Sequence, residues 1–324
     1  MPNIKQIILQ EENEKRYSRK HIDGYIREAI ENDPDMQAKV TLGVQLVLAY
    51  MGKSYYPSKN ARIKQLVDLD IPQLVLDIFV GVAYCLKEEL FTSITAQMAG
   101  RLKFSDKTEA ITTVAELMAV LCNTDAFDIL KADKMASLVI VSRLQLSKEL
   151  VKFIENSAYL PPMVCVPLKL ENNYSSGYLT HNDSLILGSG NHHSGDLCLD
   201  VLNTINTVQL QLDTQFLSTV EEDPTVEFTV AWAHKKAAEK GKTISDVKAK
   251  ERVAKAIENF YKFKCQSYNF YSLMNSQGNK FYLTSKVDKR GRIYAQGYHI
   301  NTQGTAFKKA MVELAHEELI EGMP

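Results

Sequence analysis

The first half of the chain has a hydrophobic pattern of helical period. In residues 15–32, the apolar positions Ile22, Tyr25, Ile26 and Ile30 recur at intervals of three and four, which places them on one face of a helix. Apolar patterns with turn residues between them continue to residue 123. We therefore predict further helices over residues 38–51, 71–90 and 106–123, with Ser105 capping the last of them.

The pattern changes twice in the second half of the chain. A short hairpin is predicted at 138–146 and a helix at 148–157, before Pro161, Pro162, Pro167 and Gly177 interrupt an extended segment. Helical patterns then return over residues 196–220, 226–240 and 245–275. Two strands, 281–287 and 292–300, are predicted around a tight turn.

These elements predict a mainly α fold with a small β component. We expect a helical N-terminal domain over residues 1–157, a linking region of extended chain and helices over 158–280, and a final part over 281–324. A length of 324 residues fits this division into two or three modest domains.

Composition narrows the possible function classes. The chain is 45% hydrophobic and 24% charged, as in globular proteins, and its 38 Lys and Arg nearly balance its 39 Asp and Glu. Any surface that binds nucleic acid must therefore be a local patch. Five widely spaced cysteines without a Cys-x-x-Cys motif indicate reduced thiols, and we expect no membrane-spanning segment.

The most informative stretch is residues 287–315. Asp288 and Gly291 occupy the first and fourth positions that a type I turn prefers, and the basic residues between them suit a solvated turn. Alternation in the next strand places Arg292, Tyr294, Gln296 and Tyr298 on one face. A guanidinium group beside flat rings suits contact with a phosphate backbone. Gly291 would let such a backbone approach closely.

A helix is expected after this strand. Asn301-Thr302-Gln303-Gly304-Thr305 reads as a turn that leads into it, and Phe307, Met311 and Leu314 are predicted to point inward. Lys308 and Lys309 would remain free near its start.

Residues 287–315 resemble the Asp-x-Arg-Gly-Arg segment of the single-subunit RNA polymerases of phages and mitochondria. In that family the motif continues to a Tyr, an Asn-Pro-Gln-Gly turn and a helix. The matching residues, in order and spacing, are Asp288, Arg290, Gly291, Arg292, Tyr294, Asn301, Gln303 and Gly304. Two positions depart from the family pattern, since Lys289 stands where an aromatic residue is common and Thr302 replaces the Pro.

The resemblance extends upstream. Residues 161–180 are similar to the family's passage with paired prolines, in which Leu170 stands where Trp is usual and only one Gly remains. Residues 202–217 resemble the helix that follows, so the likeness covers about residues 160–324. It implies a polymerase palm with Arg290, Gly291, Arg292 and Tyr294 binding nucleic acid. Asp288, Lys289, Gln303 and Gly304 would support them.

The resemblance also implies two-metal chemistry, in which paired Asp residues hold Mg²⁺. No Asp follows Arg292, so we expect neither catalytic residues nor metal ligands in this chain. Either a second polypeptide carries the remaining palm, fingers and Mg²⁺, as in some phages, or the chain is a degenerate, inactive relative. The split form is favoured, because the break falls after a complete predicted helix.

The resemblance thus predicts the N-terminal subunit of a two-chain, DNA-directed RNA polymerase from a phage, inactive alone. Its partners would be the second subunit, the DNA template, the RNA transcript and an accessory promoter-opening factor, in the cytoplasm of the infected bacterial host. The hairpin at 138–146 lies where the family places a strand-separating hairpin. The alternative is a non-catalytic, helical accessory protein that binds nucleic acid.

Two further features of the sequence allow more than one interpretation. His192, His193, Asp196 and Cys198 could ligate a metal, but adjacent His residues rarely bind one ion together and a polar loop is favoured. Within 245–275, Lys248, Arg252 and Lys255 share one helical face, which would suit either a path for nucleic acid or a plain exposed helix.

Overall fold

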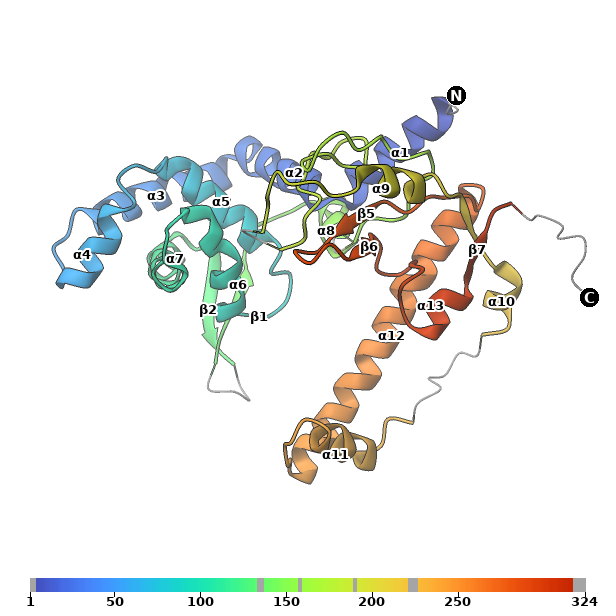
Figure 1. Ribbon diagram of the computed structural model, residues 1–324. Coiled ribbons are helices and arrows are strands. Elements are labelled where there is room, and N and C mark those ends of the chain that lie inside the picture. The colour runs from blue at the N-terminus through green and yellow to red at the C-terminus, as the bar shows by residue number, and fades with distance from the viewer. Residues whose placement is uncertain (1–3, 133–136, 157–158, 189–190, 221–226, 317–324) are drawn as a thin grey trace, which may run out of the picture. The chain divides into compact units, whose positions relative to one another are not determined.

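The computed structural model describes residues 4–132, 137–156, 159–188, 191–220 and 227–316. The chain forms two compact units (Figure 1). The helical unit comprises Arg16–Ala158. The other unit joins Met1–Lys15 to Tyr159–Pro324, and we call it the hairpin unit after the hairpin at residues 285–295. Helices dominate and the strands are short, which confirms a mainly α fold with a small β component. The three predicted domain ranges stay a prediction.

The helical unit is built around a few apolar helices and a small antiparallel sheet with strand order β1-β3-β2. Its elements are α2 (Arg19–Asn32), α3 (Pro34–Met51), α4 (Pro57–Lys64), α5 (Ile71–Ala83), β1 (Glu89–Leu90), α6 (Phe91–Met98), η1 (Ala99–Leu102), α7 (Lys107–Leu121), η2 (Cys122–Thr124), β2 (Phe127–Lys131), β3 (Leu138–Ser142) and α8 (Lys148–Asn156).

The core of this unit follows the predicted pattern. Ile22, Ile26 and Ile30 on α2 are all buried, as their helical spacing predicts. On α5 nearly every residue from Leu74 onward is buried, and the Phe79 ring meets the edge of Phe127 from β2. An apolar helix of this kind supplies most of the free energy that holds such a core together.

Three predictions for this unit were wrong. The helix predicted over 71–90 ends at Ala83, and Glu89–Leu90 form β1 because they pair with β3. The N-cap of α7 is Asp106 and not Ser105, because the Asp106 carboxylate accepts hydrogen bonds from the backbone of Thr108 and Glu109. The hairpin is formed by β2 and β3, with Phe127 opposite Ser142, and not by residues 138–146 alone. Residues 143–146 belong to no strand, and the tip of the hairpin lies outside the described residues.

The hairpin unit combines extended chain, short strands and one long helix. Its elements are α1 (Ile4–Tyr17, in this unit up to Lys15), α9 (Leu199–Asn206), β4 (Leu210–Leu212), α10 (Thr214–Ser218), α11 (Val230–Ala238), α12 (Asp246–Ser276), β5 (Ser285–Val287), β6 (Ile293–Ala295), α13 (Ala306–Ala310) and β7 (Val312–Leu314). The strands form two antiparallel pairs, β4 with β7 and β5 with β6.

The helix predicted over 196–220 is broken. Helix α9 ends at Asn206, strand β4 follows, and α10 is a separate short helix. The β-branched residues Thr207 and Val208, which follow α9 directly, disfavour its continuation. Pairing of β4 with β7 then holds the next residues in an extended conformation.

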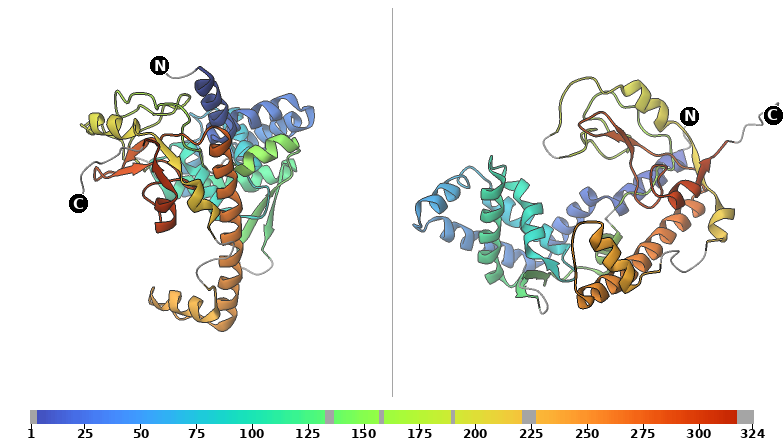
Figure 2. Two further views of the ribbon diagram at one scale, coloured as in Figure 1. Left: turned by 90° about the vertical axis from the view of Figure 1, so that its right-hand side faces the viewer. Right: turned by 60° about the horizontal axis from the view of Figure 1, so that its bottom comes forward.

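Helix α12 confirms the long helix predicted over 245–275, and Ser245 caps its N-terminus. In Figures 1 and 2, α11 lies against the N-terminal end of α12, and this end of the pair extends away from β5 and β6. None of residues 250–266 is buried. The middle of α12 is therefore exposed to solvent, and we call this part the shaft of the helix. The C-terminal third of α12 packs against the rest of the unit, where Phe270, Tyr271 and Met274 are buried.

The extended segment of the hairpin unit is held by a buried carboxylate on α1. Glu14 accepts hydrogen bonds from the backbone N–H of Leu179 and Thr180, at 2.9 and 2.7 Å, and lies beside His181. Burial opposes the charged form of Glu14. Hydrogen bonds from His181, Thr180, Gln10 and Leu179 outweigh burial and lower its pKa to about 2. Glu14 thus fixes the end of the passage that resembles the polymerase sequence.

Candidate nucleic-acid interface

The turn between β5 and β6 has a defined geometry. The backbone N–H of Gly291 donates to the carbonyl of Asp288 at 2.9 Å, and the N–H of Asp288 donates to the carbonyl of Arg292 at 3.0 Å. Gly291 has a φ of +79°, in the left-handed region that favours glycine. This is a type I turn closed by a glycine bulge, as the positions of Asp288 and Gly291 predict.

Gly291 leaves open space beside the turn. A Cβ placed on it would meet no described atom of the chain within 4 Å, and the close approach of a phosphate backbone stays a prediction. The positive φ is the reason that the turn requires glycine here. The open space beside Gly291 is still available to another molecule.

Asp288 organises both arginines of the turn. Its carboxylate accepts hydrogen bonds from the backbone N–H groups of Arg290 and Arg292, at 2.9 and 3.1 Å. It also pairs with both guanidinium groups, at 3.3 Å for Arg290 and 2.6 Å for Arg292. Desolvation opposes the charged form, but the backbone and side-chain hydrogen bonds from Arg292 outweigh it and hold the pKa of Asp288 below its ordinary value.

The two guanidinium groups remain open to solvent. The side chains of Arg290 and Arg292 are 62% and 54% exposed, whereas that of Asp288 is 16% exposed. The partly buried carboxylate of Asp288 therefore holds two exposed guanidinium groups close together. Each guanidinium group keeps further N–H donors for an anion, and such an arrangement suits adjacent phosphates.

The predicted four-residue face is only partly present. Arg292 lies over the Tyr294 ring at 5.6 Å, so these two side chains do share a surface. Strand β6 ends at Ala295, and Gln296 accepts a hydrogen bond from the Thr284 hydroxyl at 2.5 Å. Tyr298 stacks on Tyr159 instead, because the positive φ of Gly297 breaks the strand alternation.

The Asn-Thr-Gln-Gly turn covers the outer edge of β6. The amide oxygen of Gln303 accepts from the Ala295 N–H at 2.9 Å, and its amide nitrogen donates to the Ile293 carbonyl at 3.1 Å. Asn301 donates to the carbonyls of Ala295 and Gly297. The Gln303 side chain thus replaces a neighbouring strand and holds Ile293–Ala295 in register behind Arg292.

Replacing Gln303 with alanine should loosen β6. Two backbone groups would lose their partners, which costs roughly 1–1.5 kcal/mol locally and opens the strand about tenfold more often. Hydrogen exchange of the peptide that contains Ala295 measures this opening. Gln303→Glu keeps the acceptor and loses the donor, so its exchange should be intermediate. Unchanged hydrogen exchange in Gln303→Ala would show that the Gln303 side chain does not hold the outer edge of β6.

The remaining predicted residues are placed less centrally. Lys289 is exposed at the tip of the turn. Gly304 begins the approach to α13, where a Cβ would meet the Lys308 side chain, whose flexible atoms lie 2.5 Å away.

The predicted helix after the turn was too long. Helix α13 covers only Ala306–Ala310, and β7 follows because it pairs with β4. Met311 is buried as predicted, but Leu314 is 60% exposed in β7. Lys308 is not free, since its ammonium group contacts the Tyr298 carbonyl and lies over two aromatic rings.

The loop with the paired histidines has other contacts. His192 lies 3.0 Å from the Ser184 hydroxyl and against the Tyr174 ring, while His193 accepts from the Gly195 N–H. Asp196 accepts from the Cys198 N–H. Over the described ranges, no group of three or more His, Cys, Asp or Glu could hold a metal ion. Nor does any helix of those ranges have the length and apolarity to cross a membrane.

The exposed shaft of α12 carries a basic face. Lys248, Arg252, Lys255 and Lys262 are all exposed, and their spacing places them on one side of the helix. Glu251 precedes Lys255 by four residues and Glu258 precedes Lys262 by four, so acidic side chains adjoin this face. The sequence left a nucleic-acid path and a plain exposed helix open, and both stay open.

Sequence reasoning missed two features of this unit. It did not find that Tyr159 meets Tyr298, nor that His299 is buried beneath them. These residues are far apart in sequence from their partners and belong to no periodic pattern. A single sequence gives no signal for such contacts.

The chain is similar to a distant relative among known proteins. No family model matches the chain. The chain is 26% identical over 163 residues to a probable DNA-directed RNA polymerase of Gelasinospora sp. (strain G114). The match covers 47% of this chain and 17% of that protein, so it spans less than a fifth of the relative's length. This similarity supports a relationship to DNA-directed RNA polymerases.

Proposed function

We propose that the chain is a subunit of a single-subunit-type, DNA-directed RNA polymerase, in which the β5–β6 turn contacts the backbone of the RNA–DNA hybrid. The carrying observation is the pair of exposed guanidinium groups that one carboxylate, Asp288, holds together. Two sequence observations support it as well. They are the similarity to a probable polymerase and the resemblance of residues 160–324 to the polymerase segments, which includes the same turn.

The turn suits a backbone better than a base edge. The backbone N–H group and the guanidinium group of each arginine both contact the Asp288 carboxylate. The two guanidinium groups are therefore oriented before a ligand arrives. Tyr294 lies beside Arg292 and offers a flat surface to a sugar. Contacts of this kind position a duplex and carry little sequence information, as a polymerase that copies any template requires.

The proposal assigns catalysis to another polypeptide. The Asp288 carboxylate is engaged by two guanidinium groups and two backbone N–H groups, which leaves it poorly suited to bind Mg²⁺. A second subunit would carry the catalytic Asp residues and Mg²⁺, which supplies charge stabilisation at the transferred phosphoryl group. We further propose a phage origin, with action on DNA template and RNA transcript in the cytoplasm of an infected bacterium.

Two other surfaces would serve the same enzyme. The basic face of α12 would follow the nucleic-acid backbone, and its binding should weaken as salt rises. The β2–β3 hairpin, with strands of five residues each, would separate DNA strands, with or without an accessory promoter-opening factor. The alternative function is a non-catalytic accessory protein that binds nucleic acid through the same turn.

Reconstitution tests this proposal. The purified chain, given Mg²⁺, nucleoside triphosphates and a preformed RNA–DNA scaffold, should extend no RNA. Adding a polypeptide that carries the polymerase Asp pair, coexpressed from a neighbouring coding sequence, should give extension. Extension by the chain alone would contradict the assignment. Binding of the scaffold without extension in any pairing would favour the accessory protein.

A further inference from the structure

An aromatic cluster lies next to the β5–β6 hairpin but outside the turn. The rings of Tyr159 and Tyr298 are stacked, with centroids 3.9 Å apart and an angle of 8° between their planes. The edge of Phe263, from α12, meets Tyr298 at 5.7 Å. The cluster therefore joins the start of the extended segment, the chain after β6 and the long helix of the same unit.

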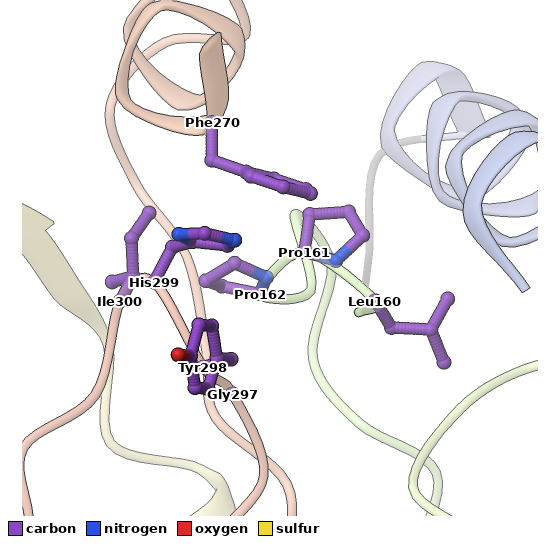
Figure 3. Close-up of a pocket in the computed structure, with 8 residues that line it drawn as sticks. All are labelled: Leu160, Pro161, Pro162, Phe270, Gly297, Tyr298, His299 and Ile300. Carbon is purple, nitrogen blue, oxygen red and sulfur yellow. The ribbon is translucent and has the colours of Figure 1, made fainter. Parts of the chain in front are cut away.

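The base of this cluster is rigid. His299 is buried between Phe263 and Phe270, and its ring lies 2.8 Å from the Ser267 hydroxyl. Figure 3 shows the His299 ring beside Phe270 and Pro162. The space that these residues enclose leaves no room for a water molecule. A packed base of this kind keeps the rings above it in one orientation.

The upper part of the cluster is open. Tyr159 and Tyr298 are 38% and 40% exposed, although two stacked aromatic rings would ordinarily bury much of their area. The pair presents aromatic surface to solvent on a fixed support.

A cation completes the surface. The Lys308 ammonium lies 4.3 Å from the Tyr298 ring centroid and 5.1 Å from that of Phe263. It also contacts the Tyr298 carbonyl, which fixes its position relative to the stacked pair. An ammonium group has three donors, so a phosphate can still be bound.

We propose that the Tyr159–Tyr298 pair is a stacking platform for an unpaired base of single-stranded DNA, with Lys308 at the neighbouring phosphate. Flat rings beside a cation are the combination that binds single strands without sequence preference. A paired base in a duplex cannot reach such a platform, so this surface takes a different ligand from the Arg290–Arg292 turn. The inference extends the proposed function to the unpaired strand and needs no catalysis.

Fluorescence anisotropy with labelled oligothymidylate tests the platform. Tyr159→Leu should weaken binding about tenfold, since stacking of one base on one ring is worth about 1–3 kcal/mol. Tyr159→Phe keeps the ring and should bind like the wild type. Lys308→Met should lower the salt dependence by about 0.7 in the logarithmic slope.

A matched control separates stacking from general damage. Tyr174 is also an exposed tyrosine packed on another ring, that of His192, and Tyr174→Leu should leave binding unchanged. Thermal melting followed by the fluorescence of Trp232, the chain's single tryptophan, should show each variant folded. Photocrosslinking with an iododeoxyuridine oligonucleotide should label Tyr159 or Tyr298.

The outcomes separate this proposal from the polymerase role. Wild-type binding by a folded Tyr159→Leu variant, or crosslinks confined to other residues, would overturn the platform. If single-strand binding depends on Tyr159 while hybrid binding does not depend on Arg292, the platform stands and the proposed function falls. If hybrid binding depends on Arg292 while single-strand binding does not depend on Tyr159, the proposed function stands and the platform falls.

Discussion

Replacing Arg292 with alanine should weaken binding of an RNA–DNA hybrid by about ten- to a hundredfold, the range expected for a lost charge-assisted contact. The guanidinium group is half exposed and is held by Asp288 at 2.6 Å, so it meets a phosphate without losing much side-chain entropy. Arg292→Lys should recover only part of the affinity, because an ammonium group cannot form the two parallel hydrogen bonds of the fork.

Arg143 provides a matched control for this experiment. It is another exposed arginine, paired with the carboxylates of Asp125 and Asp128 next to the β2–β3 hairpin. Arg143→Ala removes the same charge, and it breaks ion pairs with two carboxylates where Arg292→Ala breaks one. Hybrid binding should therefore stay within about twofold of wild type if surface charge alone has little effect, as is usual for isolated surface pairs.

A structural role for Arg292 predicts a different result. If Arg292 only stabilises the turn through Asp288, Arg292→Ala and Arg292→Lys should both lower the melting temperature and leave hybrid binding intact. Electrophoretic mobility shift with a preformed hybrid, together with thermal melting, distinguishes the two. Wild-type affinity and salt dependence in Arg292→Ala would end the hybrid-holding role.

The turn itself could be predicted because its geometry is local. Asp at the first position and Gly at the fourth determine a type I turn, and the positive φ of Gly291 is the physical reason. The long helix α12 was predicted for a similar reason, since Ser245 caps its N-terminus. Signals of this kind depend only on residues within a few positions of one another.

The errors arose where distant contacts decide the structure. Residues 210–212 continue a helical pattern, yet they form β4 because β7 lies beside them. Leu314 fits a helical apolar face, yet it lies in β7 and is exposed. The contact of Glu14 with Leu179 joins residues that are 165 positions apart in the sequence. Tertiary pairing overrides local propensity in each case, and one sequence does not reveal the partners.

The hairpin unit should lose stability as pH falls from about 6.5 to about 4, because His299 is buried in its neutral form. Burial, with a smaller contribution from the Lys308 charge, lowers the pKa of His299 from its ordinary 6.5 to about 4. The unfolded chain therefore takes up a proton on this residue before the folded chain does. Stability from neutral His299 is complete above about pH 6.5 and is lost progressively down to about pH 4, a total of about 3 kcal/mol.

Urea titration followed by Trp232 fluorescence measures this loss, because Trp232 lies on α11 of the same unit. His299→Phe keeps a ring between Phe263 and Phe270 and cannot titrate, so the stability change between pH 6.5 and 4 should shrink. At pH 7 this variant should lose only about 1 kcal/mol, the value of the hydrogen bond to Ser267. His193→Gln, which replaces an exposed histidine of the same unit, is the matched control variant.

Glu14 should define a second and lower window. Its folded pKa of about 2 lies below the ordinary 4.5, so its contribution is present above about pH 4.5 and is lost as pH falls toward 2. In His299→Phe the stability should stay nearly constant down to about pH 4.5 and then fall, since Glu14 is unchanged. A wild-type slope between pH 6.5 and 4.5 in His299→Phe would show that another group titrates in this window and that His299 is not its cause.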